Sequence, residues 1–152
     1  TIRTGERTFD AAAVLRRHGA DTAAVKRLFQ SDMEDTVAKY KILQSAKLYR
    51  KVAVAAPEEP QERVVAAQAA DELLSIQGVR ASFVIFRVGN EIAISARSLG
   101  DVNVQILLEE FGGGGHLNMA GAQIKNSTTN DVRKALIRVL DEKLSEATKK
   151  NN

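Results

Sequence analysis

The sequence predicts a mixed α/β fold, in which a compact domain with a mixed sheet is flanked by helices and preceded by a helical segment. Two runs typical of strands, residues 79–88 and 91–97, are joined by Gly89–Asn90, which is a strong hairpin signal. Another such run, residues 48–56, ends at a proline and precedes a helical pattern at residues 61–75. An amphipathic pattern at residues 129–147 predicts a long final helix.

The amino-acid composition excludes several classes of function. The 152 residues are 44% hydrophobic and 27% charged, as in ordinary soluble globular proteins. The absence of cysteine excludes disulfides, thiolate metal sites and a cysteine nucleophile. Only 5% of residues are aromatic, which argues against a platform of stacked aromatics for single-stranded nucleic acid. Because no signal peptide or membrane-length apolar run is present, we expect no direct membrane contact by these residues.

The net charge of +3 is unevenly distributed. Residues 1–51 contain 11 Lys/Arg against 6 Asp/Glu, whereas residues 52–152 contain 11 against 13. A basic first third is compatible with an anionic partner such as a nucleotide or nucleic acid, and a solvated helical surface is the alternative.

The remaining elements follow from caps and periodicity. Three helices are expected near the N-terminus, at residues 8–18, at residues 22–29 and from Ser31 to about Ala46, where Glu34 completes a capping box. Residues 103–111 predict a helix capped by Asn103 or Asp101, and residues 122–125 a short strand.

Gly112–Gly115 lie between the helix at residues 103–111 and His116. One glycine is enough to end a helix, so four in succession leave backbone N–H groups that can form a concave nest for an anion. A helical turn at residues 118–121 would strengthen that site with its N–H dipoles. The alternative is a flexible loop or a tight chain crossing. The spacing fits neither a P-loop nor a Rossmann fingerprint.

Arg97 and Ser98 end the predicted strand at residues 91–97, just before Asn103 at the next helix. A guanidinium in that position can bind a phosphate with its fork of donors, and Ser98 and Asn103 can add hydrogen bonds. The alternative is a surface ion pair between Arg97 and Asp101.

The segments Ser95–Ser98 and Gly112–His116, together with Ala120–Gly121–Ala122, resemble the DHH-associated domain of subfamily one, the substrate-binding lobe of DHH phosphoesterases. Residues 3–21 look like the tail of a DHH catalytic domain. Over nearly all of residues 1–147 the chain is most similar to the GdpP-type cyclic di-AMP phosphodiesterases. The domain division expected from the resemblance is a DHH tail at residues 1–30, a linker helix at 31–47 and the DHH-associated domain at 48–147.

The resemblance implies that the parent enzyme hydrolyses cyclic di-AMP to linear pApA with two divalent metals, usually manganese, held by Asp and His of the DHH domain. It also implies a membrane-anchored parent with these residues on the cytoplasmic side. The associated lobe grips the dinucleotide. The substrate-binding residues expected here are Arg97, Ser98, Asn103, Gly112, Gly113, Gly114, Gly115 and His116, with Arg3 and Arg7 as weaker candidates.

The sequence contains no DHH triplet, and its two histidines, His18 and His116, are far apart. We therefore expect no metal centre or catalytic residue in this chain, which would be inactive alone. His18 and Asp10 are expected to be helix-end residues. Gly121 stands where relatives often have Ala or a hydroxyl residue, and this departure implies a looser pocket wall and a different substrate preference.

Two other functions stay open. One is the equivalent lobe of a RecJ-like or oligoribonuclease-type phosphoesterase that degrades short oligonucleotides from the 3′ or 5′ end. The other is a non-enzymatic binding or oligomerisation module. The expected partners are thus a cyclic dinucleotide or short oligonucleotide, the DHH catalytic domain of the same protein, and a second copy in a homodimer.

Overall fold

The computed structural model describes residues 22–150, so the helix expected at residues 8–18 lies outside the described part of the chain. The chain divides into two units, residues 1–37 and residues 38–152. The first described element is one continuous helix, α2 (Thr22–Gln44), which corrects the prediction of a break before Ser31. Strong helix formers such as Lys26, Arg27 and Met33 surround the capping-box pattern, so propagation of the helix outweighs that local signal.

Within the described residues, six strands form one sheet in the order β1-β2-β3-β4-β6-β5. Only β2 and β3 are parallel, so the sheet is mixed, as the sequence predicted. The predicted hairpin is confirmed, with Gly89 at positive φ between β3 and β4. The strands are β1 (Lys47–Tyr49), β2 (Val52–Ala55), β3 (Ala81–Val88), β4 (Glu91–Ser98), β5 (Gly114–Gly115) and β6 (Met119–Lys125).

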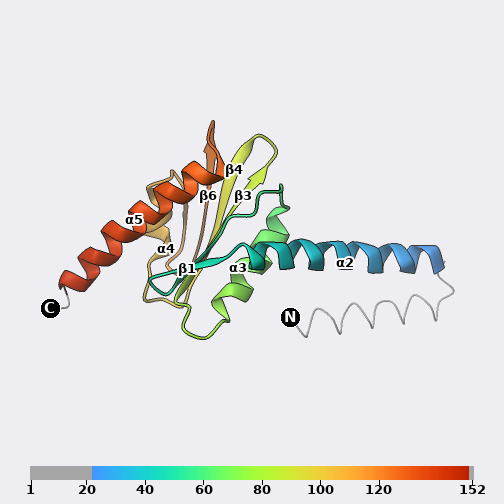
Figure 1. Cartoon of the computed structure of the whole chain (residues 1–152), viewed down its shortest axis with the longest axis horizontal. Helices are drawn as coiled ribbons and strands as arrows, with labels where there is room; N and C mark the ends of the chain where they lie inside the picture. The colour runs from blue at the N-terminus through green and yellow to red at the C-terminus, as the bar shows by residue number, and fades with distance from the viewer. Residues whose placement is uncertain (1–21, 151–152) are drawn as a thin grey trace. The chain divides into compact units, whose positions relative to one another are not determined.

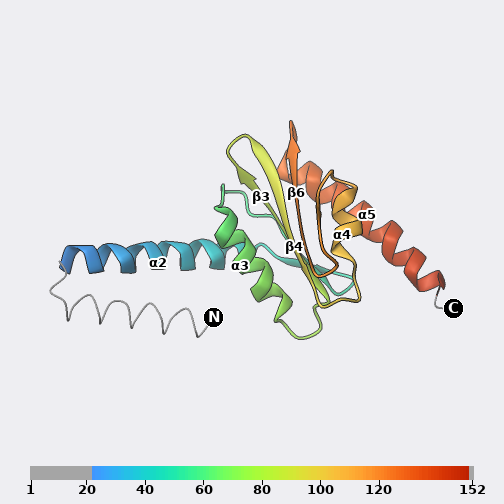
Figure 2. The same ribbon diagram turned by 180° about the vertical axis from the view of Figure 1, so that it is seen from behind.

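Helices cover the two faces of the sheet differently (Figures 1 and 2). One face, here called the α3 face, packs against α3 (Arg63–Leu74) through buried side chains such as Ala69, Val84 and Phe86. The opposite face, called the α4/α5 face, packs against α4 (Val104–Glu109) and α5 (Thr129–Lys150). The helix α3 packs mainly on β3 and β4. On the α3 face, Gly121 and Gln123 of β6 and Gly114 of β5 are exposed.

The predicted single strand at residues 48–56 is wrong, because β1 and β2 form a hairpin turning at Arg50–Lys51. Both turn residues have positive φ, 47° and 66°. Such turns normally carry Asn or Gly, so the sequence held no turn signal here.

This turn allows a stability prediction. Lys51 is exposed and adopts the left-handed conformation that strains side chains other than Gly. Lys51→Gly is expected to raise the free energy of unfolding by about 0.5–1 kcal/mol, since relief of strain outweighs the added entropy of the unfolded chain. Urea denaturation measures the change, and a destabilised variant would contradict the assigned turn.

None of the helices in residues 22–150 is both long enough and apolar enough to span a membrane.

Candidate functional site

The first residues of the glycine run are accounted for by local structure, beginning with the end of α4. Gly112 ends α4 with φ 73°, and its N–H donates to the Glu109 carbonyl at 3.0 Å. The Gly113 N–H donates to the Leu108 carbonyl at 2.9 Å. These two bonds are those of a Schellman helix end, for which glycine is preferred.

Gly113 and Gly115 lie against the neighbouring strand β6. A Cβ on Gly113 would come within 3.0 Å of the Gly121 carbonyl oxygen, and one on Gly115 would crowd the Met119 carbonyl equally. The run therefore joins the sheet as its edge strand β5 instead of forming a free loop. The tight chain crossing, one alternative left open by the sequence, accounts for these two glycines.

The predicted nest of free amides needs correction. The N–H groups of Gly112 and Gly113 are used by the helix end, and that of His116 donates to the Met119 carbonyl at 2.7 Å. The helical turn expected at residues 118–121 is also wrong, because β6 begins at Met119. Neither a helix N-terminus nor a row of free amides lies beside the run.

Gly114 is the exception. A Cβ there meets no atom within 4 Å, and its φ is not in the left-handed region. Its partner across the ladder, Gly121, is also exposed, and a Cβ there would meet the Ile94 carbonyl oxygen only at 3.4 Å. Packing within the protein does not require either residue to be glycine, so this pair has a side-chain-free surface that the fold does not explain.

The Gly114–Gly121 pair forms the floor of a cleft of about 520 Å³ on the α3 face. Gly112 and Gly113 continue the floor on one side and Ser95 of β4 on the other. Gln123 and Arg63 form its far wall. Arg63, Ser95 and Gln123 were not predicted as site residues, because long-range pairing alone brings α3, β4 and β6 together.

Strand register places Arg97 beside this cleft. Ser95, Gly121 and Gly114 are directly opposite one another on β4, β6 and β5, and so share one face. In the next row Arg97 pairs with Met119, whose carbonyl accepts from the His116 N–H. The rows lie two residues apart, about 7 Å along the strands. Arg97 and the Gly114–Gly121 pair therefore lie on the same face of the sheet, and His116 directly follows the end of β5.

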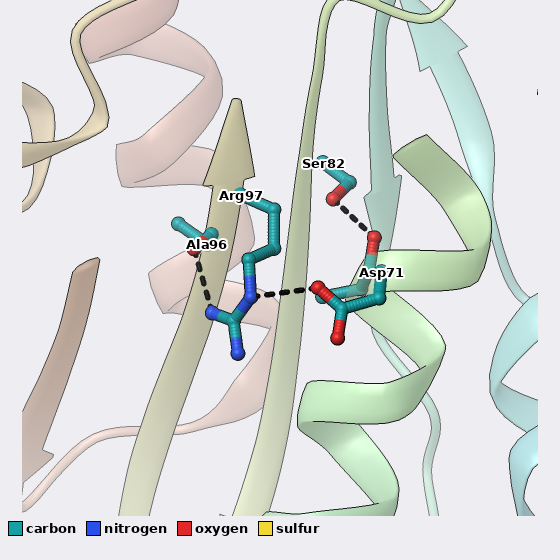
Figure 3. Close-up of polar contacts among 5 residues, drawn as sticks. Asp71, Ser82, Ala96 and Arg97 are labelled. Atoms are coloured by element: carbon teal, nitrogen blue, oxygen red, sulfur yellow. Dashed lines mark hydrogen bonds and ion pairs between the residues drawn. The ribbon is translucent and has the colours of Figure 1, made fainter. Parts of the chain in front are cut away.

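Two protein acceptors fix the Arg97 guanidinium (Figure 3). Its Nε donates to Asp71 at 2.9 Å and its Nη1 to the Ala96 carbonyl at 2.9 Å, and only 12% of the side chain is exposed. This corrects the alternative of a pair with Asp101, which contacts Arg80 instead at 3.5 Å. Among the described residues the Arg97 Nη2 has no partner, so one end of the fork is free for an anion.

The helix that carries Asp71 is itself held to the sheet. The buried Ser82 hydroxyl of β3 donates to the Ala70 carbonyl at 2.6 Å, immediately before Asp71 (Figure 3). This bond, together with the apolar contacts of α3, sets where the Asp71 carboxylate stands relative to β4.

Two other expected site residues have local structural bonds. Ser98 is buried, and its hydroxyl accepts from the Gly100 N–H at 3.0 Å. Asn103 caps α4 by accepting from the Ile106 N–H at 3.2 Å, as the sequence predicted for a cap. Neither residue lines the cleft.

Metal-ligating groups do not cluster in the described part of the chain. No set of three or more His, Asp or Glu residues within residues 22–150 is arranged to hold a metal ion. These residues do not fit the two-metal centre of a phosphodiesterase, so no chemical step is assigned to a metal here.

The model of the DHHA1 domain matches residues 49–146, which is more than half of the chain. The chain belongs to the DHHA1 family. This DHHA1 chain is 46% identical over 145 residues to the cyclic-di-AMP phosphodiesterase PdeA of Listeria monocytogenes, covering 93% of this chain and 22% of that protein. It is 42% identical over 148 residues to the cyclic-di-AMP phosphodiesterase GdpP of Bacillus subtilis, covering 93% of this chain and 22% of that protein.

The fold recurs in an exopolyphosphatase-related protein from Bacteroides fragilis, with a TM-score of 0.63 and 21% identity over 86% of this chain and 42% of that chain. That likeness concerns the fold alone. The DHHA1 chain spans about a fifth of the length of the curated relatives it matches.

Proposed function

We propose that this chain is the substrate-binding lobe of a metal-dependent phosphodiesterase that hydrolyses cyclic di-AMP to the linear dinucleotide pApA. The proposal rests mainly on the Gly114–Gly121 pair, whose lack of side chains is not required by packing within the protein. Beside this pair lies the Arg97 guanidinium, which is held by two acceptors and has one terminal nitrogen without a partner in the described residues. The names of the relatives that are 42% and 46% identical support the substrate.

In this proposal Arg97 binds a phosphate of the dinucleotide through Nη2, because a charge-assisted hydrogen bond to a phosphate oxygen is about twice as strong as a neutral one. The exposed His116 follows β5, and its backbone N–H donates to the carbonyl of Met119. In this proposal its imidazole donates to the same phosphate or to a base edge. The bare glycine floor lets the nucleotide lie directly on the backbone. The site therefore binds and orients the substrate.

Hydrolysis belongs, in this proposal, to two metal ions, expected to be Mn²⁺, in a DHH domain of the parent protein. The 152-residue chain alone is then a binding lobe without turnover. Incubating it with Mn²⁺ and cyclic di-AMP should leave the nucleotide intact on chromatography. Steady conversion to pApA, lost in Arg97→Ala, would contradict this division of labour.

Calorimetric titration tests the proposal directly. The chain is expected to bind cyclic di-AMP or pApA more tightly than AMP, since AMP fills only one half of a dinucleotide site. No measurable heat with either dinucleotide would contradict the proposed function. Affinity that instead rises steadily with RNA length, together with a steep salt dependence, would favour the short-oligonucleotide phosphoesterase.

The role of Asp71 can be tested separately, because Asp71 accepts a hydrogen bond from Arg97 but does not line the cleft. Asp71→Ala is expected to weaken cyclic di-AMP binding by about 3- to 10-fold, since the guanidinium loses one of its two anchors. Asp71→Asn should stay within about twofold, because the amide oxygen still accepts from Nε.

The matched control for Asp71 is Asp101→Ala, an exposed aspartate whose partner is Arg80. It should leave affinity unchanged. If Asp71→Asn weakened binding as much as Asp71→Ala, the charge of Asp71 would matter more than its position.

A further inference from the structure

Arg63 and Gln123 form the wall of the cleft opposite to Arg97, and they come from different elements. Arg63 is the first residue of α3, and Gln123 lies on β6 two residues beyond Gly121, on the same face. With its carbonyl oxygen turned toward Arg63, the Gln123 amide accepts from Nη1 at 3.2 Å and also from Nη2. The opposite orientation would place the amide nitrogen against the guanidinium, donor against donor.

Several polar groups around the cleft have hydrogen-bonding or charge-pairing groups that are not used within the described protein. Arg63 has no carboxylate partner in residues 22–150, although seven other Lys or Arg residues in that range do. The half-buried Ser95 hydroxyl also has no hydrogen-bond partner in the described chain. With the Gln123 amide fixed by Arg63, its N–H groups remain available, while its oxygen accepts from both terminal nitrogens of Arg63. A bare floor with a few convergent polar groups is the usual form of a small-molecule site.

We propose that a base of the dinucleotide lies on the Gly114–Gly121 floor, and that Gln123, positioned by Arg63, selects adenine by binding its edge. This inference rests on the proposed function and adds the residue that sets base preference. In this proposal the Gln123 N–H donates to N7 of adenine, and the Gln123 oxygen, shared with Arg63, faces the N6 amino group, so that the amide matches the donor and acceptor of the adenine edge. The corresponding edge of guanine presents two acceptors, N7 and O6, and suits a guanidinium better.

The dimensions of the cleft agree with such a ligand. Its volume of about 520 Å³ lies within the range of roughly 300–1,000 Å³ usual for small-molecule sites. Ser95 lies beside the glycine pair on β4, directly opposite Gly121, and Gln123 lies two residues along β6 from Gly121. A flat base over the glycines can therefore meet Gln123 at one edge and the Ser95 hydroxyl at another.

The test compares the affinities for cyclic di-AMP and cyclic di-GMP by calorimetry on the 152-residue chain. Gln123→Glu keeps the shape and the contact with Arg63 but removes the donor to N7. We expect it to weaken cyclic di-AMP binding by roughly 5- to 100-fold, the value of one bidentate base contact, and to reduce the preference for adenine. Lys125→Gln is the control, since this exposed residue lies on the same face of β6 outside the cleft.

Arg63 is tested as a positioning residue through base preference, which loss of stability alone would not change. Arg63→Ala should reduce the ratio of the two affinities in the same direction as Gln123→Ala. The double variant should lose no more selectivity than Gln123→Ala, because Arg63 acts through Gln123. An unchanged ratio in Gln123→Glu, with cyclic di-AMP still bound, overturns this inference and leaves the proposed function standing. Failure of the unmodified chain to bind either dinucleotide overturns both.

Discussion

Alanine at Gly113 is expected to lower the free energy of unfolding by about 2–3 kcal/mol, whereas alanine at Gly114 should change it by less than about 0.5 kcal/mol. At Gly113 the new methyl group would meet the Gly121 carbonyl and Ala122 closer than 3.0 Å, and backbone cannot move aside cheaply. At Gly114 the methyl group would extend into empty space above the α3 face. Urea denaturation of both variants measures the difference.

Ligand binding should show a different pattern for Gly114. The Gly114→Ala variant should remain as stable as the unmodified chain. The new methyl group would nevertheless occupy the floor of the cleft, where the nucleotide is proposed to lie. The affinity for cyclic di-AMP should therefore fall by about 10-fold or more. Equal stability of the two variants would contradict the close approach of β5 to β6. A stable Gly114→Ala that binds normally would show that its bare surface has no ligand.

Arg97→Ala is expected to weaken the affinity for cyclic di-AMP by about 10- to 100-fold. A hydrogen bond to a charged group contributes about 1.5–3 kcal/mol, and here the donor is already fixed by Asp71 and Ala96. Arg97→Lys should recover only part of the affinity, because one ammonium cannot reproduce the planar fork.

The control for Arg97 is Arg80→Ala, which removes a cation that is paired with Asp101 and does not line the cleft. It should bind as the unmodified chain does. Thermal melts of the Arg97 variants separate affinity from folding, since the Arg97 side chain is only 12% exposed and contributes packing. Affinity that is the same in Arg97→Ala and the unmodified chain would remove Arg97 from the site.

The parts of the fold that could be predicted are those specified by short-range sequence signals. Gly89–Asn90, the cap at Asn103 and the periodicity of residues 129–147 each act within a few residues, and the hairpin, α4 and α5 follow from them. The turn at Arg50–Lys51 was missed because tertiary contacts of β1 and β2 hold residues there in a conformation their side chains disfavour.

The glycine strand was unpredictable for a related reason. Gly114 and Gly115 have almost no intrinsic preference for β structure, and β6 contains further small residues such as Ala120 and Gly121. Their pairing exists because bare backbone allows the two strands to approach closely. Side-chain patterns do not record that kind of contact.

The site was predictable only where its residues form a continuous pattern. Arg97, the glycine run and His116 could be proposed from the sequence because they lie within about 20 residues of one another. Asp71 and Arg63 come from the two ends of α3, and no spacing links them to β4 or β6. Their roles arise from how α3 packs on the sheet, which the sequence does not state.

Nuclear magnetic resonance mapping of a dinucleotide titration tests the central claim most directly, since the glycine amides report on the site itself. Adding cyclic di-AMP to the ¹⁵N-labelled chain should shift the amide signals of Gly112–Gly115 and Gly121, and the Arg97 side-chain signal, far more than those of α5. Shifts confined to α5 and the α4/α5 face, with the glycine signals unmoved at saturation, would contradict it.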